Sequence, residues 1–431
     1  MIYENLGVNK QGHLTVGAHD TVTLAGEYGT PLMVLDEVRV RENCRTYTAN
    51  ISKYFPSGSM AVFASKALSF KSIYNVIDSE GFGSDAVSCG EIYTIDASAF
   101  PMEKVFFHGN CKTGEDLAYA ISKNVGYIVV DNRDELFALD AIAREHSKVQ
   151  KILLRLTPGI DPHTHAKIST GGIDSKFGTP IENGQALSLL SEAISLSNIK
   201  VCGFHCHIGS QIFECDPFID AADIMLGFVK TAKEKLSFDT EIVNLGGGFA
   251  VRYVESDPEI DIAENLKLLG THIKDVCKNL GIAEPKIVLE PGRSIVADTC
   301  ITLYKVGSVK EIPNVKNYVA VNGGMTDNPR FTLYGSKYTV VNASRASDEC
   351  DFVCTLAGGC CESGDILQEN VAIAKPVRDD IISVLTTGAY NYSMASNYNR
   401  FCRPALVIIN GDDIRIGIKR ETFEALLKND V

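Results

Sequence analysis

The stretch Ala61-Val62-Phe63-Ala64-Ser65-Lys66-Ala67-Leu68 places a single lysine at the end of a short apolar run. The run, residues 61–65, is predicted to be a β-strand, and Lys66 follows it directly. Burial beside apolar surface lowers the pKa of a lysine, and a neutral amine can attack a carbonyl to form a Schiff base. Most lysines at strand ends are simply solvated, so this stretch alone leaves the role of Lys66 open.

Short β-like runs and helix-compatible segments alternate along the chain on both sides of this lysine. Helical patterns include residues 115–123, 134–147, 217–236 and 260–280. Eight βα units over about 250 residues are typical of a (β/α)8 TIM-like barrel. An open doubly wound sheet has the same alternation, and the count of eight favours the barrel. The predicted barrel strands are 61–65, 84–87, 105–108, 127–131, 151–156, 202–207, 241–245 and 286–290.

The pattern changes after about residue 297, where strands follow one another with turn residues between them. Helical patterning is sparse there until residues 421–428. Two early runs, 14–16 and 32–35, also read as strands and could pair with this later sheet. We therefore predict an α/β fold with N-terminal strands over 1–36, a barrel over 37–297 and a mostly β domain over 298–431. The strands predicted in the last domain are 301–309, 317–321, 338–342, 351–356, 381–385 and 405–409.

Composition narrows the functional class. The 431 residues carry a net charge of -13, which argues against a nucleic-acid partner because such proteins need basic surface. No run of 18 apolar residues appears, so we expect no membrane partner. The first ten residues lack the pattern of a signal peptide, and the 13 cysteines lack the spacing of a disulfide framework, so a cytoplasmic location is expected. The cysteine spacings match no zinc pattern, and no metal is expected.

Polar, titratable or glycine residues mark most of the predicted barrel strand ends. The active site of a (β/α)8 barrel lies at the C-terminal ends of its strands. A barrel without an active site would not need polar residues at these positions. The residues at or near these ends are Lys66, Asp85, His108, Arg155, His205, His207, the glycines 246–248, Glu290 and Arg293.

Four of these features together indicate a cofactor. The glycines 246–248 are either an ordinary turn or a place where backbone N–H groups approach a phosphate. Of His205 and His207, one can stack on a flat ring while the other is structural; as zinc ligands they lack a third partner. Glu290 ends an apolar strand and needs a partner, either Arg293 or a protonated pyridine nitrogen. With Lys66, these features describe pyridoxal 5'-phosphate.

The chain resembles the diaminopimelate decarboxylase family, of the alanine racemase-like fold, also called fold type III of the pyridoxal phosphate enzymes. The resemblance runs over essentially the whole chain, through several motifs in the same order. These motifs are FASKA at 63–67, GFHCHIGSQ at 203–211, GGGF at 246–249, EPGR at 290–293, CESGD at 361–365 and GAY at 388–390.

The resemblance implies cofactor-binding roles for residues of the barrel. Lys66 would hold the cofactor covalently, His207 would stack on its ring, and Glu290 would pair with the pyridine nitrogen. Asp85 and Tyr390 would also lie beside the cofactor. The phosphate would be held by Ser210, Gly247, Gly248, Gly292 and the backbone of Arg293.

The resemblance also implies a substrate, meso-2,6-diaminopimelate, which would yield L-lysine and CO2. Arg293, Arg330 and Tyr334 would bind a substrate carboxylate, and Tyr390 would also touch the substrate. Glu362 would face the distal amino group, and Cys361 would return a proton to the carbanion. Cys361 and Glu362 would come from the other subunit of a homodimer.

Some positions depart from the family pattern, and other functions compete. Phe331 follows Arg330 where proline is usual, and Gly358-Gly359-Cys360 stands before Cys361 where the family has Gly-Pro, so that Gly359 replaces the proline. The usual Gly-Gly-Glu after the second strand reads Ser88-Cys89-Gly90-Glu91. The alternatives are another fold type III decarboxylase, acting on a basic amino acid or carboxylated polyamine, and a carrier protein that only binds the cofactor. An NAD oxidoreductase would need a G-x-G-x-x-G motif that is absent. The loop 161–178 is predicted to be either a mobile lid or a plain surface loop.

Overall fold

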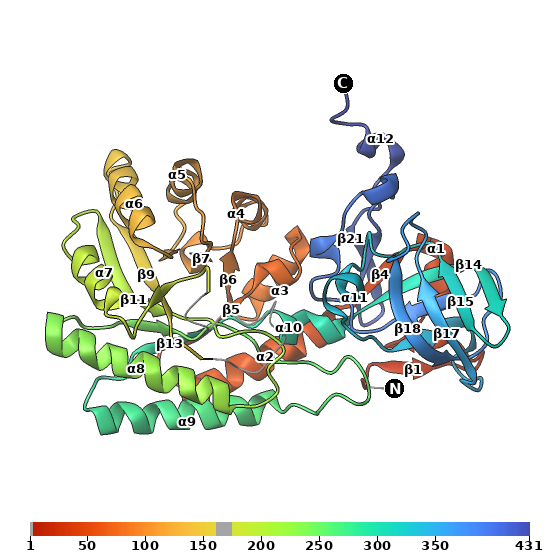
Figure 1. Ribbon diagram of the computed structural model, residues 1–431, viewed down its shortest axis with the longest axis horizontal. Helices are drawn as coiled ribbons and strands as arrows, with labels where there is room; N and C mark the ends of the chain where they lie inside the picture. The colour runs from red at the N-terminus through yellow and green to blue at the C-terminus, as the bar shows by residue number, and fades with distance from the viewer. Residues whose placement is uncertain (1–2, 161–174) are drawn as a thin grey trace. The chain divides into compact units, whose positions relative to one another are not determined.

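The computed structural model describes residues 3–160 and 175–431, and the chain divides into two compact units (Figure 1). The barrel unit comprises Asn43–Ala250 and Ile260–Ser294, and the sheet unit comprises Met1–Glu42, Val251–Glu259 and Ile295–Val431. Most of the loop 161–178 lies outside the described residues. Within the described part of the chain, no helix is both long and apolar enough to cross a membrane.

Eight parallel strands of the barrel unit form a closed ring, as predicted. The ring runs β9-β11-β12-β13-β5-β6-β7-β8, and β8 pairs again with β9. This second pairing excludes the open doubly wound sheet, which would leave two free edges. The strands are β5 (Met60–Phe63), β6 (Gly83–Ala86), β7 (Val105–Phe107), β8 (Tyr127–Val130), β9 (Gln150–Thr157), β11 (Ile199–His205), β12 (Ile242–Asn244) and β13 (Lys286–Leu289); β10 (Thr179–Pro180) adds to β9.

Apolar side chains from successive strands fill the middle of the ring. Such a layer packs the interior, so functional side chains are confined to the strand ends. The buried residues of this layer are Val62, Phe106, Val129, Leu153, Cys202, Ile242 and Val288.

Helices follow the strands and surround the ring (Figure 1). The helices are α2 (Glu37–Tyr54), α3 (Lys71–Ser79), α4 (Cys89–Asp96), α5 (Gly114–Ser122), α6 (Arg133–Glu145), α7 (Gln185–Ala193), α8 (Asp216–Leu236), α9 (Ile262–Leu280) and the short α10 (Arg293–Val296). Their starts agree with the local sequence: Thr113 and Asp116 form a capping box at the start of α5, and the Asp261 side chain caps α9.

The sheet unit is built on a strand order of β18-β17-β15-β14-β4-β20-β21; β19 also pairs with β14, and β16 pairs with β19. The N-terminal strand β4 (Leu32–Asp36) lies between two late strands, antiparallel to β14 and parallel to β20. The other strands are β14 (Cys300–Ile312), β15 (Lys316–Val321), β16 (Val340–Asn342), β17 (Phe352–Ala357), β18 (Ile366–Ile373), β19 (Ile381–Val384), β20 (Ala405–Asn410) and β21 (Asp413–Ile418).

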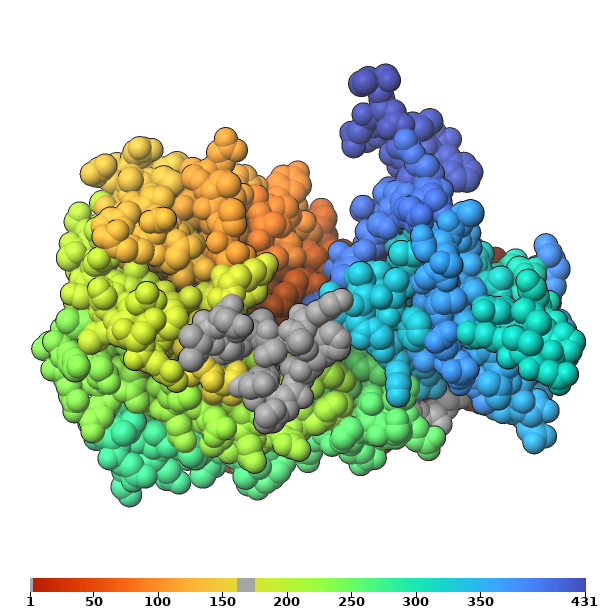
Figure 2. Space-filling view, in the orientation of Figure 1, coloured from red at the N-terminus to blue at the C-terminus, as the bar shows by residue number. Residues whose placement is uncertain are grey.

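Smaller elements complete the sheet unit. A three-stranded sheet of β1 (Leu6–Val8), β2 (Leu14–Val16) and β3 (His19–Asp20) precedes α1 (Thr21–Tyr28). The short helix α11 (Arg330–Tyr334) follows β15. The last helix, α12 (Phe423–Leu426), lies near the C-terminus, dark blue in Figure 2, and its Phe423 is exposed.

Two strands of the large sheet, β18 and β21, go beyond the predicted set, as do the short strands β1 and β3 of the three-stranded sheet. β18 has a polar centre, Gln368-Glu369-Asn370, which hides its strand character, yet it pairs antiparallel with β17. β21 alternates isoleucines with Asp413, Arg415 and Gly417, and a turn at Gly411 joins it to β20. Both lie at the ends of the sheet, where one side of a strand faces solvent and polar residues are tolerated.

Candidate active site

Lys66 lies in a single helical turn, Ser65–Ala67, directly after β5. Its neighbour Ser65 is fully buried and donates its backbone N–H to Asp85 Oδ1 over 2.7 Å. The Ser65 hydroxyl lies 3.0 Å from the same oxygen and 2.8 Å from Glu91 Oε2. Lys66 itself is exposed, which differs from the burial beside apolar surface that the sequence suggested. The chain around Lys66 is anchored through Ser65 instead.

Of the two carboxyls that meet Ser65, Asp85 is buried and Glu91 is partly buried. Burial raises the pKa of Asp85 to about 7, and burial also raises the pKa of Glu91. A hydroxyl carries only one hydrogen and cannot donate to two carboxylates at once. A proton retained on one of these carboxyls satisfies the second contact.

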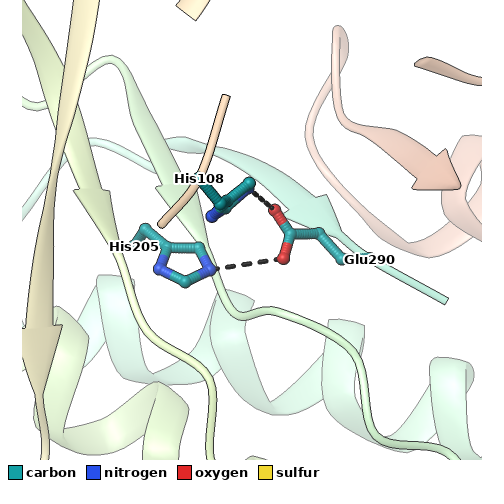
Figure 3. A group of neighbouring side chains, drawn as sticks. All are labelled: His108, His205 and Glu290. Carbon is teal, nitrogen blue, oxygen red and sulfur yellow. Dashed lines mark hydrogen bonds and ion pairs between the residues drawn. The ribbon is translucent and has the colours of Figure 1, made fainter. Parts of the chain in front are cut away.

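Glu290 follows β13 and is the centre of a buried polar cluster (Figure 3). His108 Nε2 lies 2.8 Å from Glu290 Oε1, and His205 Nε2 lies 3.3 Å from Oε2. Asn244 donates from Nδ2 to Oε1 over 2.7 Å. Although burial opposes ionisation, the two histidines hold the pKa of the Glu290 carboxyl well below its usual range. Glu290 is therefore a carboxylate whose charge is stabilised by three neighbours.

The sequence offered two candidate partners for Glu290, Arg293 and a protonated pyridine nitrogen. The protein partners that the structure shows are His108, His205 and Asn244. The predicted candidate Arg293 instead donates from Nη2 to Ser210 Oγ over 2.8 Å. The ligand atoms of His108, His205 and Glu290 all lie within 4.8 Å of one another, a spacing that metal sites share. Burial lowers the pKa of His205 to about 3, so its ring is neutral. A neutral ring that donates Nε2–H to Glu290 has no lone pair on that nitrogen for a metal.

The glycine loop after β12 is packed too closely for any side chain. A Cβ on Gly247 would overlap the backbone oxygen of Glu290, and one on Gly248 (φ 128°) would lie 2.7 Å from the backbone oxygen of Gly209. Gly292, after β13, is similarly enclosed, because its Cβ would lie 2.7 Å from the Ala64 Cβ. Such loops expose backbone N–H groups to an anion at short range. Ser210, bound to Arg293, adds a hydroxyl beside them.

His207 connects this loop to the rest of the site. The Gly247 N–H donates to His207 Nδ1 over 3.3 Å, which fixes the ring. Burial, followed by the positive charge of Lys66, lowers the pKa of His207 well below its usual value. A neutral imidazole suits stacking on a flat aromatic cofactor. The amine, the ionised carboxylate, the imidazole and the glycine cradle fit pyridoxal 5'-phosphate by their chemistry.

The other predicted site residues belong to the sheet unit. Arg330 and Tyr334 lie one turn apart on α11, and the guanidinium carbon of Arg330 is 5.9 Å from the ring centre of Tyr390. Cys361 and Glu362 are exposed, on the loop between β17 and β18. Thr332, also on α11, donates its hydroxyl to the Gly364 carbonyl over 2.9 Å and so ties the helix to that loop.

Comparison with known proteins agrees with this chemistry. The family described as "pyridoxal-dependent decarboxylase, pyridoxal binding domain" matches residues 39–297. Diaminopimelate decarboxylases from Bacillus methanolicus and Bacillus subtilis are 43% and 41% identical, covering 96% and 98% of this chain and 96% of each relative. The chain belongs to the diaminopimelate decarboxylase family. A diaminopimelate decarboxylase from M. jannaschii, solved with L-lysine, has a TM-score of 0.91 at 32% identity, covering 99% of this chain and 98% of that one.

In this member of the diaminopimelate decarboxylase family, two residues that organise the site are not assigned by the sequence. His108 lies at a predicted strand end without an assigned role, and Asn244 lies in a predicted strand with no polar role assigned. Asn244 joins Glu290 to the glycine loop, since its Oδ1 accepts the Gly246 N–H over 2.9 Å. The signal for both was their position at a barrel strand end.

Proposed function

We propose that this protein is a carboxy-lyase that converts meso-2,6-diaminopimelate to L-lysine and CO2, the last step of lysine biosynthesis. The carrying observation is the ionised Glu290, held by two histidines and an amide inside a pyridoxal-binding barrel. A carboxylate at this position favours a protonated pyridine nitrogen, which decarboxylation needs. An alanine racemase of the same fold has arginine there, which disfavours that proton.

The barrel residues would each hold one part of the cofactor. Lys66 supplies the amine that attaches it, His207 covers one face of its ring, and Glu290 keeps the proton on its nitrogen. Gly247, Gly248, Gly292, Ser210 and Arg293 surround its phosphate. When bound, pyridoxal 5'-phosphate supplies an electron sink for the carbanion that loss of CO2 leaves at Cα.

Residues of the sheet unit would select the substrate and complete the reaction. Arg330, Arg293 and Tyr334 bind the carboxylate that is kept, because a guanidinium matches a carboxylate with paired donors. Tyr390 would lie beside the cofactor and substrate, and Glu362 would pair with the distal ammonium. Cys361 returns a proton to Cα. We propose that Cys361 and Glu362 act on a second copy of the chain, in a cytoplasmic homodimer.

The test is CO2 release from meso-diaminopimelate by the purified protein with added pyridoxal 5'-phosphate. Ornithine, arginine and carboxylated polyamines serve as the comparison panel. Turnover of diaminopimelate alone supports the proposal; turnover of the panel with none of diaminopimelate overturns it. A visible absorbance band that borohydride bleaches reports the attached cofactor, and Lys66→Ala should lose that band. A cofactor band without turnover of any substrate would favour a carrier protein.

A further inference from the structure

Arg330 is a buried cation that has no acidic partner among the described residues. It is 7% exposed, and no Asp or Glu of the described residues forms an ion pair with it. An unpaired charge in the interior is costly unless hydrogen bonds or a ligand compensate it. Burial opposes the charge, yet the hydroxyls of Tyr253 and Tyr338 raise the pKa of Arg330 above its usual value. The arginine is therefore charged, and the protein compensates it in part.

Two tyrosines hold the same nitrogen of this guanidinium. Arg330 Nη1 donates to Tyr253 Oη over 3.1 Å and to Tyr338 Oη over 3.0 Å. Both tyrosines are buried, and their rings meet edge to face at 86° with centres 5.4 Å apart. Tyr338 Oη in turn donates to Asn391 Oδ1 over 3.3 Å, so its lone pairs face Arg330. The hydrogen bond to Asn391 thereby sets the orientation of the Tyr338 hydroxyl toward Arg330.

The opposite edge of the guanidinium, formed by Nε and Nη2, has no such hydrogen bonds among the described residues. Together these two atoms form the fork that binds a carboxylate through parallel hydrogen bonds. Rotation of the guanidinium would misalign this fork, and the contacts at Nη1 oppose such rotation.

We propose that Tyr253 and Tyr338 are positioning residues that fix Arg330 at Nη1, so that its Nε–Nη2 edge presents two donors to the carboxylate that the substrate keeps. They thereby set the preference for ligands with a carboxylate at that end. This inference rests on the proposed function, which gives Arg330 that carboxylate. Neither tyrosine was predicted from the sequence, and Tyr253 comes from the short segment Val251–Glu259 that the chain inserts between β12 and α9.

The experiment compares two inhibitors of the holoenzyme, L-lysine and cadaverine, which differ only by the carboxylate. Tyr253→Phe and Tyr338→Phe keep the rings and remove one hydrogen bond to a charged group each. We expect each to weaken inhibition by L-lysine about tenfold and to leave inhibition by cadaverine unchanged. The KM for diaminopimelate should rise about tenfold, with a smaller change in kcat. Tyr28→Phe, in the same unit and remote from Arg330 in its contacts, is the matched control.

Arg330→Ala distinguishes the carboxylate-binding role of Arg330 from the positioning role of the two tyrosines. If wild type does not prefer L-lysine to cadaverine, or Arg330→Ala keeps that preference, the proposed role of Arg330 fails. If Arg330→Ala abolishes the preference while both Phe variants bind L-lysine as wild type does, the positioning role alone is overturned. Equal weakening of both inhibitors in the Phe variants also overturns it, because that pattern reports general disturbance of the fold.

Discussion

Asp365→Ala should loosen the loop that carries Cys361. The Asp365 carboxylate is buried and accepts two backbone N–H groups, from Met325 over 2.6 Å and from Cys360 over 2.7 Å. Its own backbone closes the loop, since Asp365 O accepts the Gly358 N–H over 2.9 Å. The Asp365 side chain therefore connects the loop that carries Cys361 to the segment that precedes α11.

The expected magnitude follows from these two bonds. A hydrogen bond to a charged group contributes about 1.5–3 kcal/mol, and each N–H left buried without a partner loses that amount. Local opening of each segment should become easier by a similar energy, which corresponds to about 10–100-fold faster amide exchange. Asp365→Asn retains one acceptor oxygen and should speed exchange in only one of the two segments.

Hydrogen exchange measured by mass spectrometry on peptides covering residues 323–326 and 358–365 is the direct assay. We expect turnover to fall by about tenfold to a hundredfold, because a misplaced acid is a poor proton donor, while cofactor content stays constant. Asp348→Asn changes an exposed carboxylate in the same unit and is the control. Unchanged exchange of both segments in Asp365→Ala would refute the reasoning.

Three further predictions concern the site and its pH dependence. Gly247→Ala should lose most affinity for pyridoxal 5'-phosphate, because its Cβ would overlap the Glu290 carbonyl; equilibrium titration of the cofactor checks this, and normal affinity would contradict it. Cys361→Ala should retain the cofactor and lose about 10²–10⁴-fold in turnover, so wild-type turnover would remove its assigned role. Burial raises the pKa of the Asp327 carboxyl to about 7, so the folded state keeps a proton that the unfolded chain releases above pH about 4. The free energy of unfolding should fall as pH rises from about 4 to about 7, and Asp327→Asn should flatten that fall in thermal unfolding curves; equal slopes in both proteins would count against it.

Much of the barrel was predictable because its strands are short apolar runs separated by amphipathic helices. The period of hydrophobic residues and the count of eight are local properties of the chain. Closure of the ring, through the pairing of β8 with β9 and of β13 with β5, depends on contacts between distant segments. In the sheet unit, β18 was missed because its polar centre is compatible with a loop until β17 lies beside it.

Site residues whose own side chain indicates a role could be predicted from the sequence. Roles that depend on contacts with residues from other strands could not. The need of Glu290 for a compensating partner followed from its apolar strand. Which partner it has did not, since His108, His205 and Asn244 come from three other strands or their ends. The tyrosines around Arg330 are ordinary apolar positions in sequence, and only folding shows that their hydroxyls meet one guanidinium.

The place of β4 in the sheet has a consequence for synthesis of the chain. Leu32–Asp36 leaves the ribosome early, but its two neighbours are residues 300–303 and 405–409. Both hydrogen-bonding edges of β4 therefore remain unpaired while the residues of the whole barrel are synthesised. Contacts of such long sequence separation form slowly and leave unpaired strands exposed to aggregation. The barrel is the part of this protein that can fold first on the ribosome, and a chain that stops before residue 405 would leave β4 with one edge permanently unpaired.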